Sequence, residues 1–257
     1  MRIVSIHAHP DDAEILAGGT LALLSALGHE IVIVSLTAGD CGSTVHGPNE
    51  IATIRKAEAA ESAALIGGRY RCGGFRDMAI FSDDPSRRAV TGLLRELRAE
   101  IVLTAAPSDY LSDHEAASQL VRDACFAASI PNYTTPAESP ALPAIPHLYF
   151  MDPIDQRDRN GHVTVPDFTA NVASTFEMKR AMLAKHQSQG LWLQQQHGMK
   201  DYIQQMEDWT RACGTRAGIA LGEGFRQYRV HPYPHEPLLQ QLLLGYLGNV
   251  ETVSLDP

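Results

Sequence analysis

Apolar and polar positions along the first 152 residues alternate between two kinds of segment. Short, nearly continuous apolar runs rich in β-branched residues, such as Glu30–Leu36 and Ile101–Ala105, are typical of strands buried on both faces of a sheet. Longer segments between them carry apolar positions at helical spacing, as in the amphipathic Ser86–Arg98. Strands that alternate with helices predict a mostly parallel sheet with helices on both faces, which is an α/β fold.

The boundaries of these elements follow from the apolar runs and from glycines that end helices. The predicted strands are Arg2–Ile6, Glu30–Leu36, a short Arg69–Cys72, Ile101–Ala105 and His147–Met151. The predicted helices between them are Ala13–Leu27, Asn49–Leu65, Ser86–Arg98 and Asp113–Ser129.

The pattern changes after about Asp152, where apolar strand-like runs give way to polar and helical segments. The segments expected there are helices at Ser174–Gln189 and Met199–Arg211, a loop or edge segment at Tyr228–Pro237, and a short terminal helix at Leu238–Leu247. We therefore expect a single domain over residues 1–257, with a core at about 1–152 and a C-terminal helical cap at about 153–257.

Composition and charge exclude several classes of protein. The net charge of −9 makes a nucleic-acid backbone an unfavourable partner. No uninterrupted apolar stretch approaches the ~20 residues that span a bilayer, so no membrane association is expected. The four cysteines are scattered and form no C-x-x-C pair, a usage that fits a reducing compartment, and we expect a cytoplasmic protein.

Two polar clusters follow two of the predicted strands. His9, Asp11 and Asp12 come directly after the first strand, and Asp113 and His114 follow the strand Ile101–Ala105. Ligands of open α/β sheets bind at the carboxyl ends of strands, so two parallel strands could bring both clusters together. His9, Asp12 and His114 would then supply the three protein ligands of a catalytic zinc site. Asp11 would remain free to act as a general base on the activated water.

These residues are similar to the signature of a known family. The run Ala8-His9-Pro10-Asp11-Asp12-Ala13-Glu14 and the later Asp113-His114 resemble the PIG-L (LmbE-like) zinc-dependent N-deacetylases. The resemblance extends from residue 3 to about residue 189. It includes the segments Ala17-Gly18-Gly19-Thr20, Ile54-Arg55-x-x-Glu58-Ala59, Phe75-Arg76-Asp77 and Lys185-His186-Gln187-Ser188-Gln189.

The resemblance implies a Rossmann-like three-layer sandwich and a role for each matching residue. His9, Asp12 and His114 would hold Zn²⁺, or another divalent transition metal such as Fe²⁺. Asp11 would be the general base. Arg55, Asp77 and His186 would bind polar groups of a small-molecule amino-sugar substrate. The implied activity is removal of the N-acetyl group from an N-acetylglucosaminyl compound or conjugate.

Leu111 is a departure from the family pattern. Many members carry H-x-D-H at the second motif, whose first histidine assists the oxyanion, and Leu111 stands in its place. The residues that could substitute for it are Tyr110, His186, His231 and His235. Leu111 also keeps open a zinc-binding carbohydrate-binding protein with little turnover. An amidase on a larger N-acyl group is the other alternative.

The remaining polar residues of the two motifs have plainer interpretations. The run from His9 to Asp12 could be a turn in which Asp12 caps the following helix. Asp113 is interpreted as a helix N-cap that could also orient a histidine, and Glu14 as a charge in a first helical turn. His7 is interpreted as a core histidine or as one that orients a neighbouring site residue. The leucines of Leu238–Leu247 are interpreted as core or interface packing, and the second alternative predicts a homo-oligomer.

Overall fold

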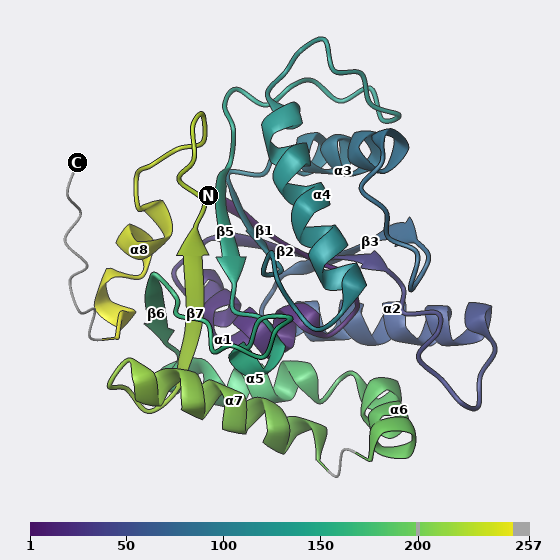
Figure 1. Cartoon of the computed structure of the whole chain (residues 1–257), viewed down its shortest axis with the longest axis vertical. Coiled ribbons are helices and arrows are strands. Elements are labelled where there is room, and N and C mark those ends of the chain that lie inside the picture. The colour runs from purple at the N-terminus through teal and green to yellow at the C-terminus, as the bar shows by residue number, and fades with distance from the viewer. Residues whose placement is uncertain (199–200, 249–257) are drawn as a thin grey trace.

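The computed structural model describes residues 1–198 and 201–248, which form a sheet covered by helices on both faces (Figure 1). The strands are β1 (Arg2–His7), β2 (Glu30–Thr37), β3 (Arg69–Phe75), β4 (Ile101–Thr104), β5 (His147–Met151), β6 (Phe168–Asn171) and β7 (Gly222–Gln227). The α-helices are α1 (Asp12–Ala26), α2 (Pro48–Leu65), α3 (Asp84–Leu97), α4 (Ser112–Ala128), α5 (Phe176–Leu183), α6 (Gln187–His197), α7 (Tyr202–Arg216) and α8 (Leu238–Leu242). Short 3₁₀ turns lie at Ile154–Gln156, Ala173–Thr175 and Leu244–Tyr246.

The sheet has the strand order β3-β2-β1-β4-β5-β7-β6. Strands β1 to β5 pair in parallel, and β7 pairs antiparallel with both β5 and β6. Strand β1 lies between β2 and β4. The chain runs from β1 through α1 to β2 and through α2 to β3 on one side of β1, and it then passes through α3 to β4 on the other side. The order in which strands are added to the sheet therefore reverses at β1, and open α/β sheets bind ligands at such a reversal.

Alternate residues of the central strand enter two separate cores. Ile3 of β1 packs in the same cluster as Leu21 of α1, together with residues of α2, α5 and α8. Ile6 of β1 packs on the other face in the cluster that contains Leu120 of α4 and residues of α3. Side chains alternate between the two faces of a strand, so this arrangement makes three layers, helices–sheet–helices, and confirms the predicted fold class.

The C-terminal region differs from the expected helical cap because it also supplies two strands. Strands β6 and β7 extend the same sheet beyond β5, where no strand was predicted. The predicted helix Ser174–Gln189 is wrong as a single element, since α5 ends at Leu183 and α6 begins at Gln187. The predicted helix Leu238–Leu247 is likewise divided, with α8 ending at Leu242 before a 3₁₀ turn.

Helix α7 follows the prediction Met199–Arg211 with shifted bounds, and Met199 itself lies outside the described residues. The loop predicted at Tyr228–Pro237 contains no helix or strand. Within residues 1–198 and 201–248, no helix combines the length and apolar character needed to cross a membrane.

Candidate metal and catalytic site

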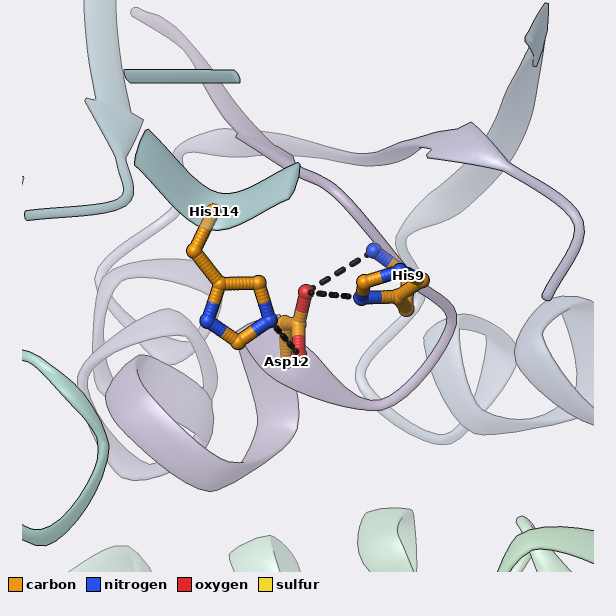
Figure 2. A group of neighbouring side chains, drawn as sticks. All are labelled: His9, Asp12 and His114. Carbon is orange, nitrogen blue, oxygen red and sulfur yellow. Dashed lines mark hydrogen bonds and ion pairs between the residues drawn. The ribbon is translucent and has the colours of Figure 1, made fainter. Parts of the chain in front are cut away.

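The candidate site lies where β1 and β4 end side by side. Ile6 of β1 is paired in parallel with Thr104 of β4, so the segments that follow both strands emerge at one edge of the sheet. His9 lies in the turn after β1, Asp12 begins α1, and His114 lies in the first turn of α4. The three side chains point toward one another in Figure 2. The two polar clusters of the sequence therefore meet, as expected from the strand pattern.

The three residues form a compact donor set around the carboxylate of Asp12. Its Oδ2 atom lies 3.4 Å from His9 Nδ1, and its Oδ1 atom lies 3.4 Å from His114 Nε2. One ligand atom from each residue falls within 4.8 Å of the others. Ligands placed at the usual zinc bond lengths on a tetrahedron are separated by about 3.3 Å, so the residues fit a zinc-type ion. The same His9 also belongs to a second such group, with Asp77 and Asp113.

The electrostatics of this group favour a bound cation. Burial alone lowers the pKa of His114, but the charge of Asp12 and a hydrogen bond with Asp109 raise it to about 9. Burial likewise lowers the pKa of His9, yet hydrogen bonds with surrounding aspartates raise it well above its usual value. Burial raises the pKa of Asp12, and the two histidines outweigh that effect and hold it well below its usual value. The aspartates thus surround two imidazoles with negative charge, which a metal would neutralise in place of protons.

Asp11 stands beside the ligands with an unusual backbone. Its φ of 100° is left-handed, and its side chain forms no capping hydrogen bond although Asp11 is the N-cap of α1. The side chain of Asp12 does not cap the helix either, because its Oδ2 atom accepts from the backbone N–H of His9, at 2.8 Å, on the N-terminal side of α1. The helix-capping interpretation of this run is therefore wrong. Strained backbone of this kind gathers at functional sites, where the rest of the fold holds it in place.

The carboxylate of Asp11 is buried between two side chains, and the sequence analysis predicted neither contact. Tyr202 of α7 donates a hydrogen bond from its hydroxyl to Oδ2, and Arg55 Nη2 lies 3.6 Å from Oδ1. Burial is the largest effect on the pKa of Asp11 and raises it; Arg55 lowers it and Asp12 raises it, and the net pKa is about 6. A carboxylate with a pKa near neutrality suits proton transfer at physiological pH.

The three predicted substrate residues lie at or near the site, but their polar atoms meet groups of the protein. Arg55 is 2% exposed and donates to the carbonyls of Pro10, at 2.9 Å, and Gly39, at 3.2 Å. Asp77 lies 3.0 Å from His9 Nε2 through its Oδ1 atom. Their assignment to substrate stays a prediction.

His186, the third of these residues, is buried against helix α1. Its Nε2 atom lies 3.1 Å from Glu14 Oε1, and the same oxygen accepts from Ser62 Oγ at 2.6 Å. Glu14 is in the first turn of α1, as interpreted, but it is a buried member of this network instead of a solvated charge. His7 is also buried, and burial lowers its pKa to about 4, which agrees with a core histidine.

The second motif differs from expectation in its local structure. Helix α4 has Leu111 as its N-cap, so the N-cap interpretation of Asp113 is wrong. Asp113 Oδ2 instead accepts from the backbone N–H of Met78 at 2.8 Å and lies 3.5 Å from His9 Nε2. Tyr110 is exposed and sets its ring edge-on to His114, with centroids 5.5 Å apart.

His231 and His235 cannot replace the missing histidine at Leu111. They follow β7, which runs antiparallel to β5, with Gln227 at the end of β7 paired to Tyr149 near the start of β5. The segment after β7 therefore leaves the sheet at the edge opposite the candidate site. The expectation that either histidine could serve the oxyanion is wrong for this topological reason.

Two site residues were given no role by sequence reasoning, although Asp109 lies in the polar group that follows the strand Ile101–Ala105. Tyr202 belongs to a predicted helix far along the chain, and no motif marks it. Asp109 is 3% exposed, and its Oδ1 atom lies 2.9 Å from His114 Nδ1. An aspartate five positions before a ligand histidine was the only available signal, and spacing alone does not separate it from an ordinary loop aspartate.

The fold and the donor set define a three-layer α/β protein with a His–Asp–His group suited to a metal at the carboxyl edge of its sheet. Comparison with known families gives the particular assignment. Residues 4–125 match the model of the PIG-L family, which is described as GlcNAc-PI de-N-acetylase.

Known relatives carry deacetylase names. The chain is 29% identical to a 1D-myo-inositol 2-acetamido-2-deoxy-alpha-D-glucopyranoside deacetylase of Corynebacterium diphtheriae, over 41% of this chain and 45% of the relative. It is 27% identical to the diacetylchitobiose deacetylase of Thermococcus kodakarensis, over 73% of this chain and 70% of the relative. The chain spans about half the length of the curated relatives that it matches first.

Solved structures share the architecture over almost the whole chain. The conserved protein TT1542 of Thermus thermophilus superposes with a TM-score of 0.72 and 26% identity, covering 91% of this chain and 96% of that one. The 4-carboxy-2-hydroxymuconate hydratase GalB of Pseudomonas putida has the same TM-score at 21% identity, covering 91% and 98%. At that identity the second likeness describes the fold alone.

Proposed function

We propose that this protein is a metal-dependent hydrolase that removes the N-acetyl group from an N-acetylglucosaminyl-type small molecule or conjugate. One observation carries the proposal: His9, Asp12 and His114 present ligand atoms at zinc-like spacing, and the buried carboxylate of Asp11 stands beside them. The deacetylase names of the relatives support the reaction and the class of substrate.

His9, Asp12 and His114 would hold the metal, with zinc as the expected ion. When bound, a divalent ion supplies polarisation of the acetyl carbonyl and a lowered pKa for water at the site. Two imidazoles and one carboxylate are a donor set that zinc commonly takes in catalytic sites, with a further position left for water or substrate. The metal could also be another divalent transition ion, because affinity for such donors is shared across the first row.

Asp11 would act as the general base. It would accept the proton of the attacking water and return that proton to the amine as the C–N bond breaks, leaving acetate and a free amino sugar. Arg55 and Tyr202 would hold its carboxylate toward the reacting groups, since both contact it and both are held by the surrounding chain. Burial of Asp11 excludes bulk water, which strengthens its electrostatic interactions with the site.

The sharpest test uses zinc-loaded protein, a panel of N-acetylglucosaminides and the variant Asp11→Asn. We expect wild type to bind one zinc per chain and to release acetate and free amine. Asp11→Asn should keep zinc and lose about 10²–10⁴-fold in turnover, the usual contribution of a general base. Asp155→Asn, a change in an exposed carboxylate on the 3₁₀ turn after β5, is the control and should leave turnover unchanged. Absence of zinc binding, or full activity in Asp11→Asn, would overturn the mechanism.

Leu111 favours a second candidate function, a zinc-binding protein that binds N-acetylglucosaminides with little turnover. Its aliphatic side chain supplies no donor where the family pattern has a histidine, and loss of one oxyanion donor typically costs about 10²–10³ in rate. Tight binding of the same panel without acetate release would support this candidate. Mass spectrometry of the released acid separates deacetylation from cleavage of a larger N-acyl group. A cytoplasmic location and a homo-oligomer stay predictions.

A further inference from the structure

The two candidate ligand histidines share one arrangement. Each imidazole has one nitrogen against Asp12 and the other against a different aspartate. His114 turns Nε2 toward Asp12 at 3.4 Å and Nδ1 toward Asp109 at 2.9 Å. His9 turns Nδ1 toward Asp12 at 3.4 Å and Nε2 toward Asp77 at 3.0 Å. The two rings therefore approach the centre through different nitrogens.

We propose that Asp109 and Asp77 are positioning residues that fix the tautomer of the two histidines, so that His114 offers Nε2 and His9 offers Nδ1 to the metal. This inference rests on the proposed metal site. A neutral imidazole carries one N–H, and the nitrogen that donates it to a carboxylate leaves the other as the ligand. A carboxylate in this position also orients the ring and increases the basicity of the ligand nitrogen.

Asp109 is held too firmly to serve a mobile substrate. Its Oδ1 atom accepts from the backbone N–H of Leu111 at 3.2 Å as well as facing His114. Its Oδ2 atom accepts from the backbone N–H of Ile154 at 3.1 Å, just beyond the end of β5. Both oxygens are thus engaged in a side chain that is almost fully buried. The loop after β4 and the turn after β5 together set the direction of the His114 ring.

Each carboxylate oxygen of Asp77 also has a partner within the protein, and these contacts bear on its predicted role in substrate binding. One oxygen faces His9, and the other accepts from the backbone N–H of Cys41 at 3.2 Å. The side chain is 8% exposed. A buried carboxylate that is fixed by a backbone N–H and directed at a ligand histidine is well placed to orient that histidine.

A competing arrangement predicts a different nitrogen. His9, Asp77 and Asp113 also lie close enough together to hold an ion. That ion would bind His9 through Nε2, the nitrogen that faces both aspartates. Asp113 Oδ2 is farther from His9 Nε2, at 3.5 Å, than Asp77 Oδ1 is, at 3.0 Å, and it already accepts from the backbone N–H of Met78. The nitrogen of His9 that meets the metal therefore distinguishes the two arrangements.

Zinc affinity of three variants is the first test. Asp109→Asn and Asp77→Asn should each weaken zinc binding by about 10–100-fold, measured by competition with a chromophoric chelator. The matched control is Asp152→Asn, which changes an equally buried aspartate that accepts from Arg226 at 2.7 Å and contacts neither histidine. It should bind zinc like wild type. Equal affinity in all three variants and wild type would overturn the inference while leaving the metal site in place.

The second test needs no variant and therefore does not depend on how a mutant folds. Long-range ¹H–¹⁵N spectra of zinc-loaded wild type, with the two histidines assigned, report which ring nitrogen carries a proton. We expect a protonated Nδ1 in His114 and a protonated Nε2 in His9. A His9 that is protonated at Nδ1 would overturn the role of Asp77 and support the competing group. Wild type that binds no zinc would overturn the proposed function and this inference with it.

Discussion

The hydroxyl of Tyr202 donates a hydrogen bond to the carboxylate of Asp11 across 191 positions of sequence. Burial and the negative charge of Asp11 hold the pKa of this tyrosine well above its usual value, so the hydroxyl stays a donor. The contact joins the first turn of α7 to the turn that follows β1. The C-terminal helices therefore take part in the candidate site, and they do more than cover the sheet.

Removal of this hydroxyl should weaken catalysis while the substrate still binds. A hydrogen bond to a charged group contributes about 1.5–3 kcal/mol, which corresponds to a loss of roughly 10–100-fold in kcat for Tyr202→Phe. The hydrogen bond lowers the pKa of Asp11, so its loss raises that pKa. The base must be deprotonated to act. The pH at which activity falls on acidification should therefore be higher in the variant than in wild type.

Steady-state kinetics over a range of pH on zinc-loaded protein would measure both effects. Tyr70→Phe is the matched control, since its hydroxyl pairs with Ser35 at 2.6 Å on a different part of the sheet. An unchanged kcat and pH profile in Tyr202→Phe would show that Asp11 does not depend on this contact.

Arg55→Lys should reduce kcat and stability and leave KM nearly unchanged. The guanidinium bridges the carbonyls of Pro10 and Gly39, and a lysine has no planar fork to reach both. The lost contacts should lower the free energy of unfolding by about 1–3 kcal/mol. Arg71→Lys, which changes an exposed pair with Glu96, should have little effect on either quantity. A large rise in KM with normal stability would instead support direct substrate binding by Arg55.

Leu111→His should raise turnover if the oxyanion lacks a donor at this position. Leu111 is only partly buried at the N-cap of α4, so its replacement leaves no large cavity in the core. The comparison is kcat of the variant and of wild type at equal zinc occupancy, with Leu111→Asn as a control for side-chain polarity without an imidazole. A neutral or harmful effect of the histidine would indicate that another residue already stabilises the oxyanion.

The buried pair of Lys179 and Glu223 should be important for stability. Lys179 Nζ lies 2.6 Å from Glu223 Oε1, and the same carboxylate accepts from the backbone N–H groups of Gly19 and Thr20 in α1. Lys179→Met leaves a buried charge without its partner and should cost about 3–5 kcal/mol. The double variant Lys179→Met with Glu223→Gln should recover part of that loss, because the unpaired charge is gone.

Urea unfolding followed by circular dichroism would measure these free energies. Lys185→Met is the control, since Lys185 forms an exposed pair with Glu61 at 3.3 Å and should change stability by less than about 1 kcal/mol. A double variant that is less stable than Lys179→Met would contradict the explanation.

The sequence by itself determined the central part of the fold and the composition of the candidate ligand set. The strands β1, β2, β4 and β5 are apolar runs, and burial on both faces is the state that such runs require. The polar residues after β1 and β4 follow directly from the points where those runs end. A local pattern was sufficient because these features depend on the hydrophobicity of neighbouring residues.

Only the tertiary structure decided the edge of the sheet and the partners of each site residue. β7, with the sequence GEGFRQ, has no apolar run, and it is a strand because β5 and β6 supply its hydrogen bonds. Asp11 contacts Tyr202, and His114 contacts Asp109, because packing brings those side chains within hydrogen-bond distance. A hydrogen bond is decided by distance and direction in space, and the spacing of residues along the chain contains neither.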